Sequence, residues 1–465
     1  MSISEKRAVI ILAMLLTAVS LPAYALNRAG QLLHHWETAV NPVLHPEDQH
    51  KYPQIIKLPH VEIPLSFVQA NLSAQMDESI LKSLVFSKEG VPTIRWILAP
   101  GAKDIAVGSM TEIFNNELLD FLKSKKMDTS IHYEFTGYPT ASTTYLIEDP
   151  NNKTVFFVKT SNSMAPAGTY KVKKREPWES NDARIVNDYL TGLNREVPFK
   201  HFGFFPESAG FVLNGIGMAL IIREAGDINE KENSRKIYLP AFSALDPVLG
   251  AEIAKKNGFA NANEFWSKMF PQLLASAVTE LFVRTGLKFD STHSQNYLFE
   301  MDAEMRLTGR IIFRDLADMM ILKSFYDIYH EKYKLNRLMQ EKRILDPSRN
   351  ANRVGFYLTP FESTRVPLTP LLVNHPWLPN QAQLLSQWGP LFQARSAEVF
   401  RSMTGITIAN EMSEDKISFA DYPQHKRDGF GFDLMMSSTA ESWIAFMNRV
   451  LQGSAAVRAC HLVHL

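Results

Sequence analysis

Polar residues flank a predicted β-hairpin late in the chain. His293, Gln295 and Asn296 precede its first strand, and Arg314 and Asp315 follow its second strand. In an antiparallel hairpin these two segments lie side by side, so the five side chains should converge at one sheet end. An amide and a carboxylate suit Mg²⁺ beside a triphosphate, because Mg²⁺ takes few protein oxygens and completes its shell with phosphate and water. The histidine and the arginine could neutralise phosphate charge.

A purely structural role for these residues is the alternative. In that case His293 and Gln295 satisfy backbone groups of their own loop, and Arg314 and Asp315 form a local ion pair. The residue pattern alone leaves both interpretations open.

A long helix and the hairpin itself must position these side chains. Apolar residues at helical spacing predict a helix over residues 263–284, and Gly286 stands where a C-terminal cap is expected. The hairpin strands are predicted over 297–301 and 310–313, with a turn over 302–309.

A second hairpin is predicted over residues 145–160. A turn sequence at residues 149–152 separates two apolar runs, and the second run ends at Lys159. A further strand is predicted over 218–223, and a helix over 111–125. These strands should form a sheet that presents Lys159.

Composition excludes several classes of function. Lys plus Arg and Asp plus Glu both number 49, so no net positive charge attracts nucleic acid. Cys460 is the only cysteine, which excludes an intramolecular disulfide, a thiolate zinc site and an iron-sulfur cluster. His34, His35 and Glu37 are residue types found at metal sites, but here we expect a solvated polar stretch.

The first residues have the layout of a secretory signal peptide. Lys6 and Arg7 precede an apolar run over residues 8–21, and the small-residue motif Ala23-Tyr24-Ala25 follows. We therefore expect cleavage after Ala25 and a periplasmic or secreted bacterial protein, with no membrane span in the mature chain.

The late hairpin carries a family resemblance. His293-Ser294-Gln295-Asn296, followed by Arg314-Asp315, resembles the HxQN and RD signature of the IucA/IucC family. Members of this family are NRPS-independent siderophore synthetases of the aerobactin synthetase type. Tyr-Pro-Thr-Ala-Ser-Thr-Thr at residues 138–144 resembles the family's phosphate-binding segment, and Val158-Lys159 resembles its lysine-bearing strand.

The resemblance implies an ATP-dependent and Mg²⁺-dependent ligase of siderophore biosynthesis. Such enzymes adenylate a carboxylate of citrate or a similar acid, and an amine or hydroxylamine then attacks the acyl-adenylate. The partners would be these small molecules and not nucleic acid, and a homodimer is left open. By matching position, the implied catalytic residues are His293 and Arg314, the nucleotide-binding residues are Ser142, Lys159, His293 and Gln295, and the metal ligands are Asn296 and Asp315.

The expected fold is α+β, with mixed antiparallel sheets and packed helices in several lobes, like fingers, palm and thumb, around a central nucleotide cleft. The expected divisions are a signal peptide over 1–25, an N-terminal lobe over 26–135, an ATP-binding-like middle lobe over 136–250, a palm-like lobe over 251–345, and a proline-rich connector with a C-terminal helical region over 346–465.

Two other functions stay open. Thr144 stands where the family has an arginine, and Lys171 is the nearest cation to a second expected arginine, within residues 167–172. These departures fit an inactive exported binding or scaffold protein of the same fold. A kinase-like phosphotransferase, with Lys159 beside two metal ligands, ranks third.

Overall fold

The computed structural model describes most of the chain between residues 26 and 404. The predicted signal peptide over 1–25 lies outside the described residues, as do the prolines of the connector and all residues after 404. In the described part, no helix combines the length and apolar character needed to cross a membrane. The described ranges are 26–40, 55–100, 113–140, 143–162, 174–229, 235–289, 296–338, 343–345 and 381–404.

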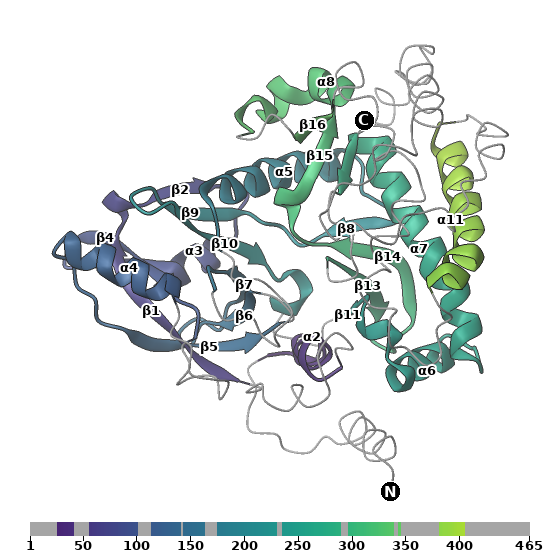
Figure 1. Cartoon of the computed structure of the whole chain (residues 1–465), viewed down its shortest axis with the longest axis horizontal. Coiled ribbons are helices and arrows are strands. Elements are labelled where there is room, and N and C mark those ends of the chain that lie inside the picture. The colour runs from purple at the N-terminus through teal and green to yellow at the C-terminus, as the bar shows by residue number, and fades with distance from the viewer. Residues whose placement is uncertain are drawn as a thin grey trace, which may run out of the picture.

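A curled sheet of nine strands forms one side of the molecule (Figure 1). Neighbouring strands are antiparallel throughout, in the order β2-β9-β10-β7-β6-β5-β1-β4-β3. Residue 135 was the expected limit of the N-terminal lobe. This sheet contains strands that precede residue 135 in the sequence and strands that follow it. The strands are β1 (Ile56–Pro64), β2 (Gln69–Leu72), β3 (Val85–Lys88), β4 (Val91–Ile97), β5 (His132–Pro139), β6 (Thr144–Glu148), β7 (Val155–Lys159), β9 (Ala209–Leu213) and β10 (Met218–Glu224).

Two smaller sheets lie on the other side. The four-stranded sheet has the order β11-β13-β14-β8, with β14 and β8 parallel, and the three-stranded sheet has the order β12-β15-β16. Their strands are β8 (Phe202–Phe204), β11 (Lys236–Pro240), β12 (Leu287–Phe289), β13 (Tyr297–Asp302), β14 (Leu307–Phe313), β15 (Met319–Leu322) and β16 (Ile344–Leu345).

Helices cover these sheets and fill the curl of the large one. α4 and α3 contribute to the apolar core of the nine-stranded sheet, whereas α5, α6, α7, α8 and α11 share the core of the smaller sheets. The α-helices are α2 (Arg28–Thr38), α3 (Glu78–Leu84), α4 (Ile113–Ser124), α5 (Pro177–Glu196), α6 (Pro247–Lys256), α7 (Ala262–Thr285), α8 (Lys323–Tyr333) and α11 (Gln381–Thr404). The 3₁₀ helices are η1 (Leu65–Phe67), η3 (Gly226–Asn229), η4 (Ser243–Leu245), η5 (Leu316–Asp318) and η6 (Leu335–Arg337).

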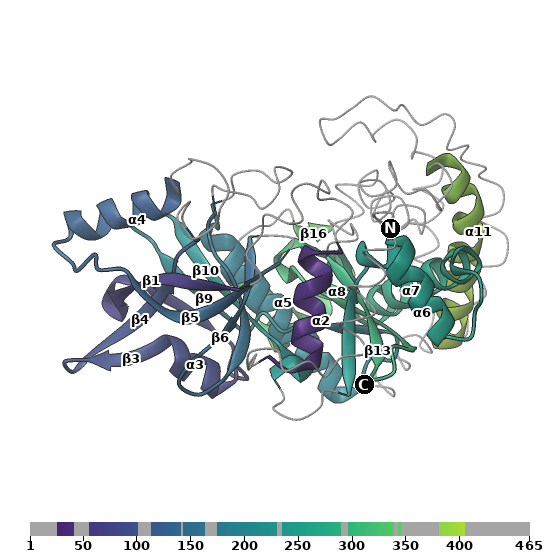
Figure 2. The same ribbon diagram turned by 90° about the horizontal axis from the view of Figure 1, so that it is seen from below.

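A third apolar core joins the nine-stranded sheet to the four-stranded sheet. It contains Phe157 of β7, Leu298 of β13, Ile312 of β14 and Leu33 of α2. Helix α2 lies between the two sheets (Figure 2). The strands β6 and β7 are therefore buried on both faces, which explains their continuously apolar sequences.

The structure confirms the expected α+β class and the main predicted elements. α7 ends at Gly286, whose φ of 64° is the left-handed conformation of a C-terminal cap. Both predicted hairpins form. The late hairpin has a shorter turn than expected, because the Asp302 carboxylate accepts N–H groups from Glu304 and Arg306 and lets β14 begin at Leu307.

Candidate active site

Lys159 and Arg223 lie on one face of the nine-stranded sheet. Along β7, Phe156 and Val158 point into the curled core, so Phe157 and Lys159 point to the opposite face. Arg223 of β10 lies opposite Phe157, and its guanidinium carbon lies 5.9 Å from the centre of that ring. Both cations therefore face the four-stranded sheet.

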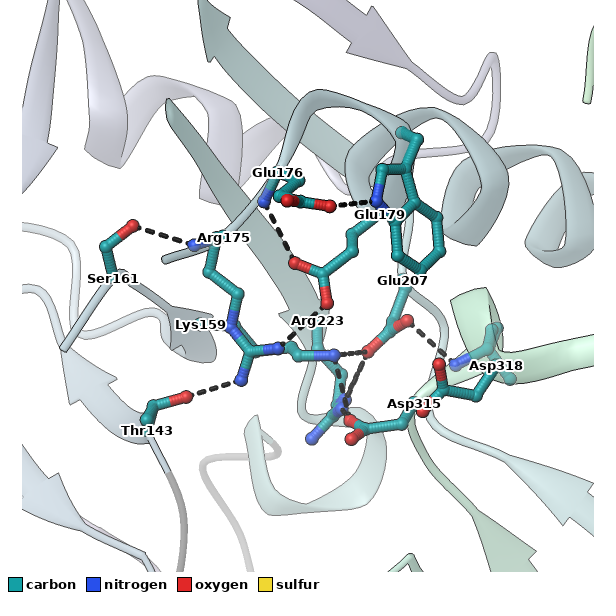
Figure 3. Close-up of polar contacts among 12 residues, drawn as sticks. Thr143, Lys159, Ser161, Arg175, Glu176, Glu179, Glu207, Arg223, Asp315 and Asp318 are labelled. Carbon is teal, nitrogen blue, oxygen red and sulfur yellow. Dashed lines mark hydrogen bonds and ion pairs between the residues drawn. The ribbon is translucent and has the colours of Figure 1, made fainter. Parts of the chain in front are cut away.

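Two carboxylates meet these cations (Figure 3). The Oδ1 atom of Asp315, which follows β14, accepts from Lys159 Nζ at 2.9 Å and from Arg223 Nη2 at 2.5 Å. The Oε1 atom of Glu207 accepts from Arg223 Nη2 at 2.6 Å and from Lys159 Nζ at 3.4 Å. Glu207 also accepts the backbone N–H of Leu316 through Oε2, at 2.9 Å. Glu207 thus connects both cations to the turn that carries Asp315.

Because most of this cluster is buried, its charges interact strongly with one another. The side chains of Lys159, Arg223 and Glu207 are 3%, 1% and 0% exposed, whereas that of Asp315 is 26% exposed. Burial acts to raise the pKa of Asp315, but the positive charges of Lys159 and Arg223 outweigh it and hold that pKa well below its usual range. Burial likewise opposes the charge of Arg223, but Glu207 and Asp315 raise its pKa above the usual value. Asp315 is therefore ionised at neutral pH.

Arg175 adds a third buried cation next to the cluster. Its backbone N–H donates to Ser161 Oγ at 2.9 Å, and its guanidinium contacts Glu179 at 3.3 Å and the hydroxyl of Thr143. Its charge also contributes to the low pKa of Asp315. Arg175 therefore contacts the segment that resembles a phosphate-binding motif, at Thr143, and its charge acts on the Asp315 carboxylate.

Arg175, Arg223 and Glu207 were not among the predicted site residues. The second cation was expected within residues 167–172, which lie outside the described residues. Arg175 directly precedes a capping box formed by Glu176 and Glu179, but that pattern predicts only the start of α5 and no role for Arg175. Glu207 and Arg223 face each other across the β9–β10 hairpin, 16 positions apart, so hairpin pairing could have predicted their contact, whereas their contacts with Lys159 and Asp315 join more distant segments.

Arg314 is paired with α2 and not with its neighbour Asp315. Its Nη1 atom lies 2.6 Å from Oε1 of Glu37, and both side chains are buried. The local ion pair considered as an alternative is therefore wrong. The expectation of a solvated stretch around Glu37 is also wrong, because α2 is packed between the two sheets. The backbone N–H of Arg314 donates to the carbonyl of Asn296 at 3.0 Å, so the predicted proximity of these two residues is confirmed.

Several residues implied by the resemblance are not placed. Ser142, His293 and Gln295 lie outside the described residues, and their roles stay predictions. Thr144 is buried and stands directly opposite Lys159 in the β6–β7 pairing. The threonine that replaces the family arginine therefore lies beside the cation cluster.

The cluster can offer Mg²⁺ one carboxylate. Both ion pairs of Asp315 use Oδ1, so Oδ2 lies outside them on a side chain that is 26% exposed. Among the described residues, no three His, Cys, Asp or Glu side chains gather as a metal-binding group. These donors suit Mg²⁺ in the way that it is commonly bound beside nucleotides. There, phosphate and water supply most of its ligands.

Solved structures share this architecture. Petrobactin biosynthesis protein AsbB from Bacillus anthracis str. Sterne matches with a TM-score of 0.52 and 14% identity, over 77% of this chain and 63% of AsbB. ATP-bound aerobactin synthetase IucA from a hypervirulent pathotype of Klebsiella pneumoniae matches with a TM-score of 0.50 and 12% identity, over 75% of this chain and 65% of IucA. The chain has the siderophore-synthetase fold.

The shared fold confirms the family resemblance at the level of architecture. The chain spans less than two thirds of the length of either AsbB or IucA. No protein-family model and no curated protein matches the sequence.

Proposed function

We propose that this protein is an ATP-dependent ligase that condenses a citrate-like carboxylate with an amine or a hydroxylamine. In the first step a carboxylate oxygen attacks the α-phosphorus of ATP, and pyrophosphate leaves. The amine nitrogen then attacks the acyl carbon of the acyl-adenylate, and AMP and a proton leave. The shared fold supports this proposal, together with the bound ATP in the IucA structure.

The cation cluster at the junction of the two sheets carries the proposal. Lys159 and Arg223 are held in place before any ligand arrives, because Glu207 and the sheet pairing fix both side chains. Preorganised positive charge in a water-poor site stabilises the negative charge that builds on phosphate oxygens during transfer. Arg175 adds further positive charge near Asp315.

Mg²⁺ belongs to the same proposal. When bound, it would be held by Asp315 and Asn296 and would neutralise charge on the phosphates.

Calorimetric titration of the full chain with ATP, with and without Mg²⁺, tests the nucleotide site. We expect Asn296→Ala and Asp315→Ala each to abolish the Mg²⁺-dependent part of the affinity while the circular dichroism spectrum stays unchanged. Unchanged Mg²⁺ dependence in both variants would remove the metal assignment. Release of pyrophosphate from ATP in the presence of citrate, with an added hydroxylamine, then tests the ligase reaction itself.

We also propose that the protein is exported, on the basis of the Lys6-Arg7 and Ala23-Tyr24-Ala25 pattern. Mass spectrometry of the protein from a periplasmic or culture fraction is expected to show a chain that begins at Leu26. An intact N-terminus in the cytoplasmic fraction alone would contradict export.

A further inference from the structure

The pair of cations at the sheet junction is neutralised entirely from within the protein. Lys159 and Arg223 bring two positive charges, and Glu207 balances one of them. Asp315 balances the other, because its single Oδ1 atom contacts both cations, at 2.9 and 2.5 Å. A carboxylate oxygen thus occupies the point where the two cationic groups converge.

The two carboxylates differ in how firmly they are held. Glu207 is fully buried, and its two oxygens are engaged by the cations on one side and by the Leu316 N–H on the other. Asp315 is the most exposed member of the cluster, at 26% of its side chain. It also occupies a turn with a φ of 72°, a conformation that only a few residue types other than glycine adopt readily. Asp315 is therefore the carboxylate that can move away from the two cations while the core stays packed.

We propose that the Asp315 carboxylate is a stand-in for an anionic ligand and that an incoming phosphoryl or carboxylate group displaces it from Lys159 and Arg223. This inference rests on the proposed function, whose substrates contain both kinds of anion, and it adds a form of self-inhibition. Asp315 keeps the buried cations neutralised, and a ligand must compete with this internal anion to enter.

Removing the charge of Asp315 should therefore improve anion binding, which is the opposite of what loss of an ordinary binding residue does. Without Asp315, one buried positive charge lacks its counter-ion, and such a charge is costly. Asparagine is the suitable replacement because it has the same shape, carries no charge and tolerates a positive φ.

The test is calorimetric titration of the full chain with sodium tripolyphosphate and, separately, with tricarballylate, in EDTA and without metal. We expect Asp315→Asn to bind at least one of these anions at least about tenfold more tightly than the unchanged protein. A gain for tripolyphosphate alone identifies a phosphoryl subsite, and a gain for tricarballylate alone identifies a carboxylate subsite. A variant that binds both anions no more tightly than the unchanged protein overturns the inference.

Two further variants separate the site from general charge effects. Asp327→Asn makes the same change of charge in an exposed pair with Lys323 on α8, and it should leave both affinities unchanged. Adding Lys159→Met to Asp315→Asn should abolish the gain. An equal gain in Asp327→Asn, or a gain that survives loss of Lys159, also overturns the inference.

These measurements do not depend on catalysis. If Asp315→Asn gains anion affinity while the unchanged protein releases no pyrophosphate from ATP and citrate, the inference holds and the proposed ligase function fails. Thermal unfolding provides a second readout for a variant that is less stable, because tripolyphosphate should then raise the midpoint of Asp315→Asn more than that of the unchanged protein.

Discussion

The Nζ atom of Lys159 lies 2.9 Å from Oδ1 of Asp315, although 156 positions separate the two residues. Lys159 ends β7 in the nine-stranded sheet, and Asp315 follows β14 in the four-stranded sheet. The apolar core between the two sheets brings these strand ends together. The geometry of the candidate site therefore depends on how the sheets dock.

Replacing Lys159 should weaken nucleotide binding. Lys159→Met keeps most of the side-chain volume but removes a buried positive charge, so we expect at least a tenfold loss of ATP affinity, or about 1.4 kcal/mol. Titration calorimetry with Mg²⁺ present measures the effect. Lys82→Met is the control, because Lys82 is 73% exposed on α3. Equal affinities in the two variants would show that Lys159 does not contact the nucleotide.

The ion pair between Glu37 and Arg314 should be important for stability. Both side chains are buried, so Glu37→Ala removes a counter-ion from a buried arginine and should cost about 3–5 kcal/mol of unfolding free energy. Urea denaturation measures this cost. The matched control is Glu78→Ala, which breaks a highly exposed pair with Lys82 and should cost below about 1 kcal/mol. Similar costs for the two variants would mean that α2 is not anchored through Arg314.

Stability should fall in mild acid because of His60. Burial, together with the neighbouring His132 and Arg95, lowers the pKa of His60 to about 4. Between pH 6.5 and 4 the unfolded chain binds a proton at this histidine that the folded protein excludes, so stability decreases as pH falls through this window. From pH 7 to pH 5 the loss from His60 should be about 2 kcal/mol.

His60→Phe isolates this contribution. The His60 ring already packs against Phe135, with 5.3 Å between ring centres, so an aromatic replacement suits the site. Urea denaturation at pH 7 and pH 5 should show a smaller loss in the variant than in the unchanged protein. His35, whose pKa burial also lowers to about 4, should supply part of the remaining dependence. Identical losses in the two proteins would exclude His60 as a source.

Gly286 should be far less replaceable than Gly258. Both glycines have positive φ, 64° and 83°, so alanine is strained by about 1 kcal/mol at either position. A Cβ atom at Gly286 would lie 2.3 Å from Cγ of Phe325, whereas at Gly258 no described atom lies within 4 Å. Gly286→Ala should therefore cost about 2 kcal/mol more than Gly258→Ala in thermal or urea unfolding. Equal costs would mean that Phe325 moves aside freely.

The sequence by itself determined the local elements and one part of the site. Helical spacing of apolar residues and a glycine cap were sufficient for α7, and turn residues between apolar runs were sufficient for both hairpins. Hairpin pairing also brought Asn296 beside Arg314, because the first residue of one strand must face the last residue of its partner.

Only the tertiary structure decided which charges meet. Arg314 pairs with Glu37, 277 positions away, and Asp315 pairs with Lys159 and Arg223 of the other sheet. Strand alternation orients each side chain toward a face, but it does not say which second sheet covers that face. That choice depends on the packing of the apolar core between the sheets, which combines contributions from α2, β7, β13 and β14 and leaves no local pattern in the sequence.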